Sequence, residues 1–286
     1  MQPSTLLKIA GRIRPLSPAA AAEPMPYEEA DGFYAAWKID DGQGKYLLKI
    51  ASPNELAVYR RLHNRIPALP RFYGAVSYYN KTYILLEFVA GHNLMRCRRE
   101  DLIRVLDAMI ELQGSFWDSR CRIGETARTA LVGCRKRRAY LTEPDLRAWL
   151  DQFLALYPTL PRTLCHNDLL PFNLILGEGR VVFIDWETGG MLPYPCMLAR
   201  LLVHGSEHGE TPFYMTREDK AFAVRYYYEH LLQDRGVPYA DYRRALELFW
   251  FFELTEWVYV YRKYRKPPDA LYDHYLAQLR QAPLLP

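Results

Sequence analysis

The sequence predicts an α+β fold, with a small antiparallel sheet in an N-terminal lobe and a larger, mainly helical C-terminal lobe. Residues 32–50 and 71–88 each have the pattern strand, turn, strand, whereas apolar residues recur at three- and four-residue intervals from Glu100 onward. The chain of 286 residues is long enough for a core divided over two lobes. We expect the N-terminal lobe over 1–90 and the C-terminal lobe over 91–286.

Composition excludes several classes of protein. Hydrophobic residues make up 50% and charged residues 24%, which is typical of a soluble globular protein. A formal charge of +4 is too small to predict a nucleic-acid partner. The most apolar stretch, 246–261, contains three glutamates, so we expect a buried helix and no membrane span. Five scattered cysteines without a C-x-x-C pair indicate reduced thiols and a cytoplasmic protein.

The N-terminal lobe begins with a proline-rich segment, Met1–Pro26, which we expect to be extended or partly helical. Strands are predicted over 32–39 and 45–50, with the turn Asp40–Gly44 between them. Lys49 lies within the apolar part of the second strand. A lysine there either points outward or needs an anionic partner, a carboxylate or a phosphate.

The next element is a helix that begins at Ser52. Ser52 suits the N-cap, Pro53 suits the first turn, and Glu55 is placed to complete a capping box. A second hairpin follows, with strands over 71–79 and 81–88.

The C-terminal lobe is predicted to be helical, with apolar residues on one face of each segment. The dense basic run Arg135–Arg138 is interpreted as a solvated helix face. Aromatic residues crowd the segment 242–261, where most must be core and a few could line a pocket for a cation. The expected helices cover 101–116, 125–141, 143–157, 197–204, 216–233, 239–266 and 269–281.

The most informative stretch is 164–187, LCHNDLLPFNLILGEGRVVFIDWE. It predicts a hairpin with strands over 174–176 and 181–184 around the turn Gly177–Gly179. A loop around Gly189–Gly190 is expected to follow it.

Three oxygen-donor side chains belong to this hairpin. Asp168 and Asn173 precede its first strand, and Asp185 ends the second. We expect folding of the hairpin to turn the two carboxylates and the carboxamide toward one point. Such a group suits Mg²⁺ and phosphates, and a carboxylate free of metal can accept a proton from an attacking hydroxyl.

The spacing H-x-D-x-x-x-x-N, followed by an Asp at a strand end, resembles the catalytic loop and metal-binding Asp of protein-kinase-like phosphotransferases. The motifs HNDLLPFN and IDWE are most similar to those of the aminoglycoside phosphotransferase and choline kinase family. The resemblance implies a protein-kinase-like fold. In it Asp168 is the catalytic residue, Asn173 and Asp185 bind the metal, and His166 supports the loop.

The same resemblance assigns residues to the nucleotide. Lys49, paired with Glu55, is expected to bind phosphates, and the backbone of Glu87 and Val89 to meet the adenine at a hinge near 87–91. The implied cofactors are ATP, with GTP as the alternative, and Mg²⁺. Glu187 is expected to reach a second metal or the acceptor.

Two positions depart from the family pattern. The loop Glu28–Gly32, expected over the phosphates, has one glycine and several acidic residues. Met197 stands where the family usually has an Asp that braces the catalytic loop. They motivate an alternative, a catalytically weakened nucleotide-binding regulatory protein of the same fold.

The function we predict is ATP-dependent phosphorylation of a hydroxyl on a small molecule. The acceptor is an amino alcohol, an aminoglycoside or a sugar, and no nucleic acid or membrane is involved. Charge does not decide among these acceptors, because the C-terminal part mixes acidic with basic residues: Glu207, Glu210, Glu253, Glu256, Arg217, Arg243, Arg244 and Arg262. The sequence does not indicate an oligomeric state.

Overall fold

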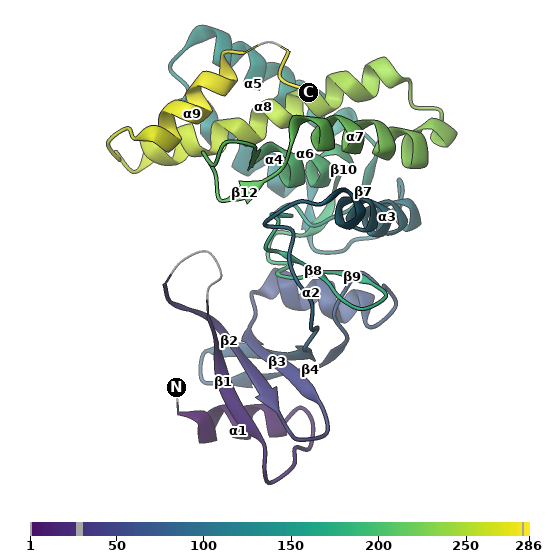
Figure 1. The fold of residues 1–286 in the computed structure, drawn as a ribbon, viewed down its shortest axis with the longest axis vertical. Coiled ribbons are helices and arrows are strands. Elements are labelled where there is room, and N and C mark those ends of the chain that lie inside the picture. The colour runs from purple at the N-terminus through teal and green to yellow at the C-terminus, as the bar shows by residue number, and fades with distance from the viewer. Residues whose placement is uncertain (1, 27–30, 282) are drawn as a thin grey trace.

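The computed structural model describes residues 2–26, 31–281 and 283–286 and confirms the α+β class. A sheet lobe lies at one end of the molecule and a helical lobe at the other, with the chain termini in different lobes (Figure 1). The five strands of the main sheet all lie before residue 88.

The main sheet is antiparallel, with the strand order β1-β2-β3-β5-β4. Lys49 on β3 lies opposite Ala36 on one side and Ile84 on the other. The expected strands are therefore present and in register. Their bounds are β1 Ala21–Pro26, β2 Phe33–Asp40, β3 Lys45–Ile50, β4 Phe72–Tyr78 and β5 Lys81–Glu87.

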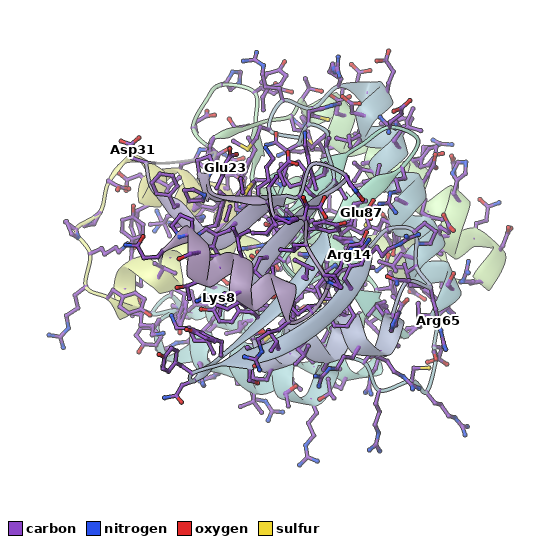
Figure 2. All side chains as sticks on the ribbon, turned by 90° about the horizontal axis from the view of Figure 1, so that it is seen from below. Lys8, Arg14, Glu23, Asp31, Arg65 and Glu87 are labelled. Carbon is purple, nitrogen blue, oxygen red and sulfur yellow. The ribbon has the colours of Figure 1, made fainter. Side chains whose placement is uncertain are left out.

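The N-terminal segment contributes more to the lobe than a lead-in would. Its helix α1, Pro3–Gly11, buries Leu6 and Ile9 against Leu48 of the sheet, and β1 adds an edge strand. Figure 2 shows α1 lying across the sheet. Just after the helix, the Arg14 guanidinium lies 5.3 Å from the ring centres of two sheet tyrosines, Tyr46 and Tyr73.

The opposite face of the sheet is covered by α2, Pro53–Leu62. The Ser52 hydroxyl caps this helix by accepting a hydrogen bond from the backbone N–H of Glu55 at 3.1 Å. Val58, Tyr59 and Leu62 are buried in the same cluster as the C-terminal core. This packing fixes Glu55, which lies on the first turn of α2, between the two lobes.

The C-terminal lobe is mainly helical, with short strands that hold its loops. The bounds of the helices are α3 Arg99–Ser115, α4 Ala127–Arg135, α5 Pro144–Leu156, α6 Pro195–Val203, α7 Arg217–Tyr227, α8 Tyr239–Lys263 and α9 Ala270–Leu279. The short turns of helix are η1 Lys136–Ala139, η2 Tyr157–Thr159, η3 Tyr228–Leu232 and η4 Gln233–Arg235. The short strands are β6 Glu125–Thr126, β7 Arg162–Cys165, β8 Leu174–Leu176, β9 Val181–Phe183, β10 Gly190–Pro193, β11 Gly205–Ser206 and β12 Phe213–Tyr214.

Two predictions for this lobe were wrong. The helix expected over 125–141 is shorter: it begins at Ala127, because Thr126 caps α4 by accepting a hydrogen bond from the Thr129 N–H, and it gives way to η1 at Lys136. The loop expected around Gly189–Gly190 continues into strand β10, which pairs with β7. Gly190 packs so closely on Glu125 that a Cβ there would lie 2.0 Å from the Glu125 carbonyl oxygen.

We propose the boundary between the lobes at residues 90 and 91. It is supported by the end of β5 at Glu87 and the start of α3 at Arg99, with two isolated bridges between them, His92 to Leu176 and Arg96 to Tyr214. Among the described residues, no helix is both long and apolar enough to cross a lipid bilayer.

Candidate active site

The hairpin expected at the centre of the chain is formed by β8 and β9. Leu174 pairs with Phe183, and the Ile184 N–H donates to the Asn173 carbonyl at 2.9 Å. This bond places Asp185, the next residue, beside the loop that carries Asp168. Asp185 has a φ of 65°, so the chain turns sharply directly after the strand.

His166 supports this junction. Its Nε2 lies 2.5 Å from the Ile184 carbonyl oxygen, so Nε2 carries the proton and donates. The ring is fully buried against Trp186, with 4.8 Å between ring centres. Burial lowers the pKa of His166 to about 4, so the ring is neutral at pH 7. His166 therefore lies where the sequence led us to expect a structural histidine.

Lys49 joins both lobes. Its Nζ lies 2.9 Å from Glu55 Oε1 and 3.1 Å from Asp185 Oδ1. Burial lowers the pKa of Lys49, but the two carboxylates raise it more, so the net shift is upward and the ammonium stays charged. The expected Lys49–Glu55 pair is present, and Glu55 uses its carboxylate for it instead of for a capping box.

Glu55 is fully buried, and one of its oxygens, Oε2, has no hydrogen-bond partner among the described residues. Burial raises the pKa of Glu55 to about 7, and Lys49 opposes the shift. A carboxylate oxygen from each of Glu55, Asp185 and Glu187 lies within 4.8 Å of the other two. Oxygen donors of this kind fit Mg²⁺.

Asn173 lies at the other side of Asp185. Its Nδ2 donates to the Asp168 carbonyl at 2.8 Å and lies 3.5 Å from Asp168 Oδ2. The side-chain oxygen of Asn173 remains as the atom that suits a metal. The structure therefore places Asn173 and Asp185 at neighbouring ends of one hairpin.

Asp168 is bound by a residue that the sequence analysis did not identify. Arg200 on α6 donates to Asp168 Oδ1 from Nε at 3.0 Å and from Nη2 at 2.7 Å. Burial raises the pKa of Asp168 to about 6, and the Arg200 charge opposes the shift. Asp168 and Asp185 are thus held by different cations, Arg200 and Lys49.

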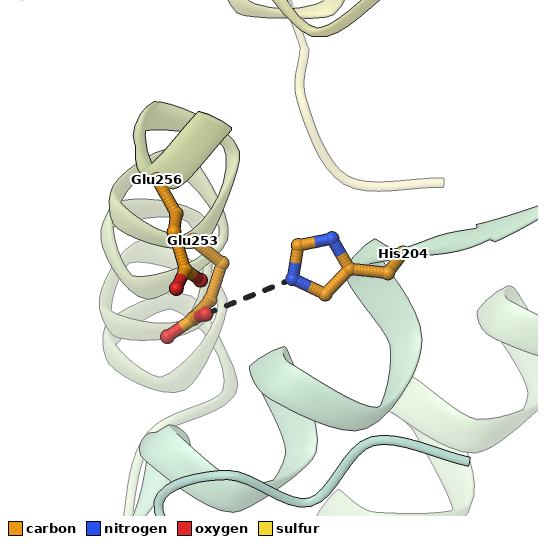
Figure 3. A group of neighbouring side chains, drawn as sticks. All are labelled: His204, Glu253 and Glu256. Carbon is orange, nitrogen blue, oxygen red and sulfur yellow. Dashed lines mark ion pairs between the residues drawn. The ribbon is translucent and has the colours of Figure 1, made fainter. Parts of the chain in front are cut away.

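Arg200 is the only charged residue of the apolar helix PCMLARLLV. Its Nη1 donates to Glu253 Oε2 at 2.9 Å and to Glu256, both on α8, and lies 3.1 Å from His204 Nε2. Figure 3 shows Glu253 and Glu256 projecting from α8 toward His204. These three side chains have the spacing of a metal site, but the Arg200 guanidinium already supplies the cation among them.

At the predicted hinge, the Glu87 N–H donates to the Arg71 carbonyl at 2.8 Å, and the Glu87 carboxylate binds Arg180 at 2.5 Å. The carbonyl of Glu87 and the backbone of Val89 are the groups that could meet a nucleotide. Residues 28–30 of the loop predicted over the phosphates lie outside the described residues.

Most aromatic residues of α8 are core, as expected, whereas Tyr239 is exposed and Trp257 and Tyr259 are half-buried. Several of their faces also carry cations of the protein itself. The Arg137 guanidinium lies 3.8 Å from the centre of the Phe252 ring, and the Lys220 ammonium lies 5.6 Å from the centre of the Trp250 ring. These faces are therefore not open to a quaternary ammonium ligand.

Two cavities lie in the helical lobe. One of about 270 Å³ adjoins the catalytic loop through Asn167 and reaches Glu253. Another of about 480 Å³ contains Glu207 and Glu210. Glu207 and Glu210 thus lie apart from Glu253 and Glu256. Of these four glutamates, Glu253 and Glu256 are the ones that contact Arg200, which binds Asp168.

Comparison with solved structures shows which fold this is. An aminoglycoside phosphotransferase from Alicyclobacillus acidocaldarius subsp. acidocaldarius DSM 446 matches with a TM-score of 0.63 and 17% identity, over 98% of this chain and 96% of that one. A choline/ethanolamine kinase family protein from Mesorhizobium loti gives 0.60 and 17%, over 98% and 95%. Amicoumacin kinase in complex with AMP-PNP and Ca²⁺ gives 0.57 and 14%, over 99% and 95%. At these identities the likeness shows the fold, which is protein-kinase-like as predicted.

No curated protein matches the sequence. A family model does, over residues 30–248, and its description is "Phosphotransferase enzyme family". The matched region includes Lys49, the loop from Asp168 to Asn173, and Asp185. The model covers more than half of the chain, and the chain therefore belongs to the phosphotransferase enzyme family.

Proposed function

We propose that the protein transfers the γ-phosphoryl group of ATP to a hydroxyl of a small molecule and that it requires Mg²⁺. The observation that supports this most is the contact of one partly buried lysine, Lys49, with both Glu55 and Asp185 beside the Asp168–Asn173 loop. The structural relatives add support, because the amicoumacin kinase was crystallised with AMP-PNP and Ca²⁺. Membership of the phosphotransferase family is consistent with phosphotransferase activity and gives the regulatory alternative no support.

Each candidate residue has one role in this proposal. Asp168 orients the acceptor hydroxyl and takes its proton. Asn173 and Asp185 hold Mg²⁺, with Glu187 as a ligand of a second ion. When bound, Mg²⁺ neutralises charge on the phosphates. Lys49 binds the phosphates while Glu55 holds it in place.

The adenine end of the nucleotide is assigned to the hinge. Among the described residues, the Glu87 carbonyl and the Val89 backbone make no backbone hydrogen bond outside the sheet, so they can meet the edge of a base. Backbone contacts of this kind leave ATP and GTP to be distinguished by assay. We propose ATP as the donor.

The acceptor is proposed to be a small cationic alcohol. Asp168, Glu253 and Glu256 surround a single guanidinium, so the group keeps an excess of negative charge. Asp168 is 38% exposed and Glu256 30% exposed, which puts that charge at the surface nearest the transferred group. An acceptor ammonium near Glu256 would bring its hydroxyl toward Asp168. Amino alcohols and aminoglycosides have this chemistry, whereas a neutral sugar does not.

The experiment is an ADP-release screen over choline, ethanolamine, aminoglycosides and sugars with MgATP. We expect turnover on a cationic acceptor and a loss of about three decades or more in kcat for Asp168→Asn, with nucleotide binding retained. Asp151→Asn is the matched control, because Asp151 makes only a surface pair with Arg138. Thermal stabilisation by MgATP without turnover on any acceptor would contradict the proposal and favour a regulatory protein.

A further inference from the structure

The carboxylate assigned as the proton acceptor is held in one orientation. Arg200 places two N–H donors on the same oxygen, Asp168 Oδ1, at 3.0 Å and 2.7 Å. The other oxygen, Oδ2, has only the long 3.5 Å approach of Asn173 Nδ2. A carboxylate bound in this way cannot rotate without breaking two charge-assisted bonds. Its Oδ2 is consequently the oxygen available to an acceptor hydroxyl.

The Arg200 guanidinium is itself held in place by contacts with α8. Its Nη1 donates to Glu253 and Glu256, so the fork spans α6, α8 and the catalytic loop. Burial raises the pKa of Glu253, but Arg200 lowers it further, and the net shift is downward. Glu253 therefore stays ionised as an anchor for the arginine.

His204 completes the anchorage. Its Nε2 lies 3.1 Å from Arg200 Nη1, whose two hydrogens it shares with the glutamates, and its Nδ1 lies 2.6 Å from the Tyr275 hydroxyl. Burial lowers the pKa of His204, which keeps the ring neutral in this arrangement. The chain of contacts runs from Asp168 through Arg200 and His204 to Tyr275 on α9.

The remaining side chains of α6 do not contribute such a contact. Met197, one turn before Arg200, is fully buried in the apolar core. Only Arg200 in this helix carries a charge. The acidic partners of Arg200 lie more than 50 residues away on α8, so the contact forms only when the whole lobe is folded.

We infer that Arg200 is a positioning residue for phosphoryl transfer, which orients Asp168 so that Oδ2 faces the acceptor hydroxyl. The inference rests on the proposed function. Arg200 acts through Asp168, and Glu253 and Glu256 act through Arg200. Positioning of this kind affects kcat more than nucleotide binding, because the misplaced group is needed only in the transition state.

The test compares Arg200→Ala, Arg200→Lys and the double variant R200A/D168N, each with MgATP and an acceptor from the screen. We expect Arg200→Ala to lower kcat about a hundredfold while the KM for MgATP stays within about twofold. Arg200→Lys should recover little, because an ammonium cannot span Asp168 and both glutamates. Arg225→Ala is the matched control, since Arg225 makes an exposed pair with Glu229.

Two readouts separate positioning from a general loss of structure. Millimolar guanidinium ion, compared with KCl at equal ionic strength, should restore part of kcat in Arg200→Ala and none in Asp168→Asn. The double variant should be no slower than Asp168→Asn alone, because Arg200 acts through Asp168. The inference would be overturned if the loss of kcat in the double variant equalled the product of the two single-variant losses. Near-normal kcat in Arg200→Ala would overturn it as well.

If Arg200→Ala fails to fold, R200M/E253Q/E256Q removes the stranded glutamate charges together with the guanidinium. It should fold, lose kcat as Arg200→Ala does, and bind MgATP. Retained kcat in this variant would overturn the inference. A wild-type protein without turnover on any acceptor overturns the proposed function as well, whereas activity that depends on Asp168 but not on Arg200 overturns this inference alone.

Discussion

The pH dependence of turnover provides a direct test of the site. Burial raises the pKa of Asp168 from an ordinary 3.8 to about 6. A proton acceptor works only when ionised, so activity is present above the pKa and is lost as the pH falls through it. The ionised fraction is about nine tenths at pH 7 and about one tenth at pH 5, given a pKa of about 6. We therefore expect kcat at pH 5 to be about a tenth of kcat at pH 7.

The assay is the initial rate of ADP release between pH 5 and pH 8, at saturating MgATP and acceptor. Glu55, with its pKa raised to about 7, is a second group that gains a proton in this range. The variant Glu55→Gln removes that titration and serves as the control. If the decrease in rate at low pH has its midpoint near pH 6 and persists in Glu55→Gln, it arises from protonation of Asp168.

A different pH profile would refute the assignment of Asp168 as the proton acceptor. With an ordinary carboxyl pKa, kcat at pH 5 would remain about nine tenths of its value at pH 7. A profile that stays flat down to pH 5 in both proteins would show that Asp168 is not the ionising acceptor in this environment. Circular dichroism at each pH would verify that the fold persists.

Three further predictions follow from contacts elsewhere in the chain. Lys49→Met should raise the KM for MgATP about tenfold to a hundredfold in initial-rate assays, and an unchanged KM would exclude Lys49 from the phosphates. In urea unfolding, Gly190→Ala should destabilise by about 1–3 kcal/mol, since its Cβ would lie 2.0 Å from a backbone oxygen, whereas the helical Gly133→Ala, with open space around it, should stabilise by about 0.5–1 kcal/mol; equal effects would contradict this reasoning. Hydrogen bonding to Arg262 lowers the pKa of Glu143 to about 2, so Glu143 contributes stability above pH 4.5 that is lost as the pH falls toward 2. Solvent screens this pair, so Glu143→Gln should cost about 1 kcal/mol at pH 7, and the difference from wild type should shrink below pH 4.5; a difference independent of pH would refute it.

Much of the site could be predicted from the sequence because its signals are local. The hairpin that presents Asn173 and Asp185 depends on two short apolar runs and a glycine turn, all within 24 residues of chain from 164 to 187. Lys49 and Glu55 are also close in sequence, on a strand and on the helix that follows it. Both arrangements are set by alternation and capping, which a sequence displays directly.

Arg200 could not be predicted in the same way, because its acidic partners come from two distant segments, the catalytic loop and α8. One signal was present: a single arginine in an otherwise apolar helix must find acidic partners, and Glu253 and Glu256 are the only charged residues of the apolar segment 248–261. The start of the helix predicted over 125–141 was missed for another reason. A threonine cap and a tight glycine contact outweighed the helical periodicity there.

The contact between Lys49 and Asp185 has a consequence for the order of events in a catalytic cycle. In the protein alone, a tethered ammonium neutralises Asp185 Oδ1 at 3.1 Å. A free divalent ion would have to displace that internal counter-ion while offering the lysine nothing in exchange. An ion that arrives already chelated by a triphosphate gives the lysine new anionic oxygens as it takes the carboxylate. Metal and nucleotide are therefore expected to enter as one complex, with little saturation by the bare ion.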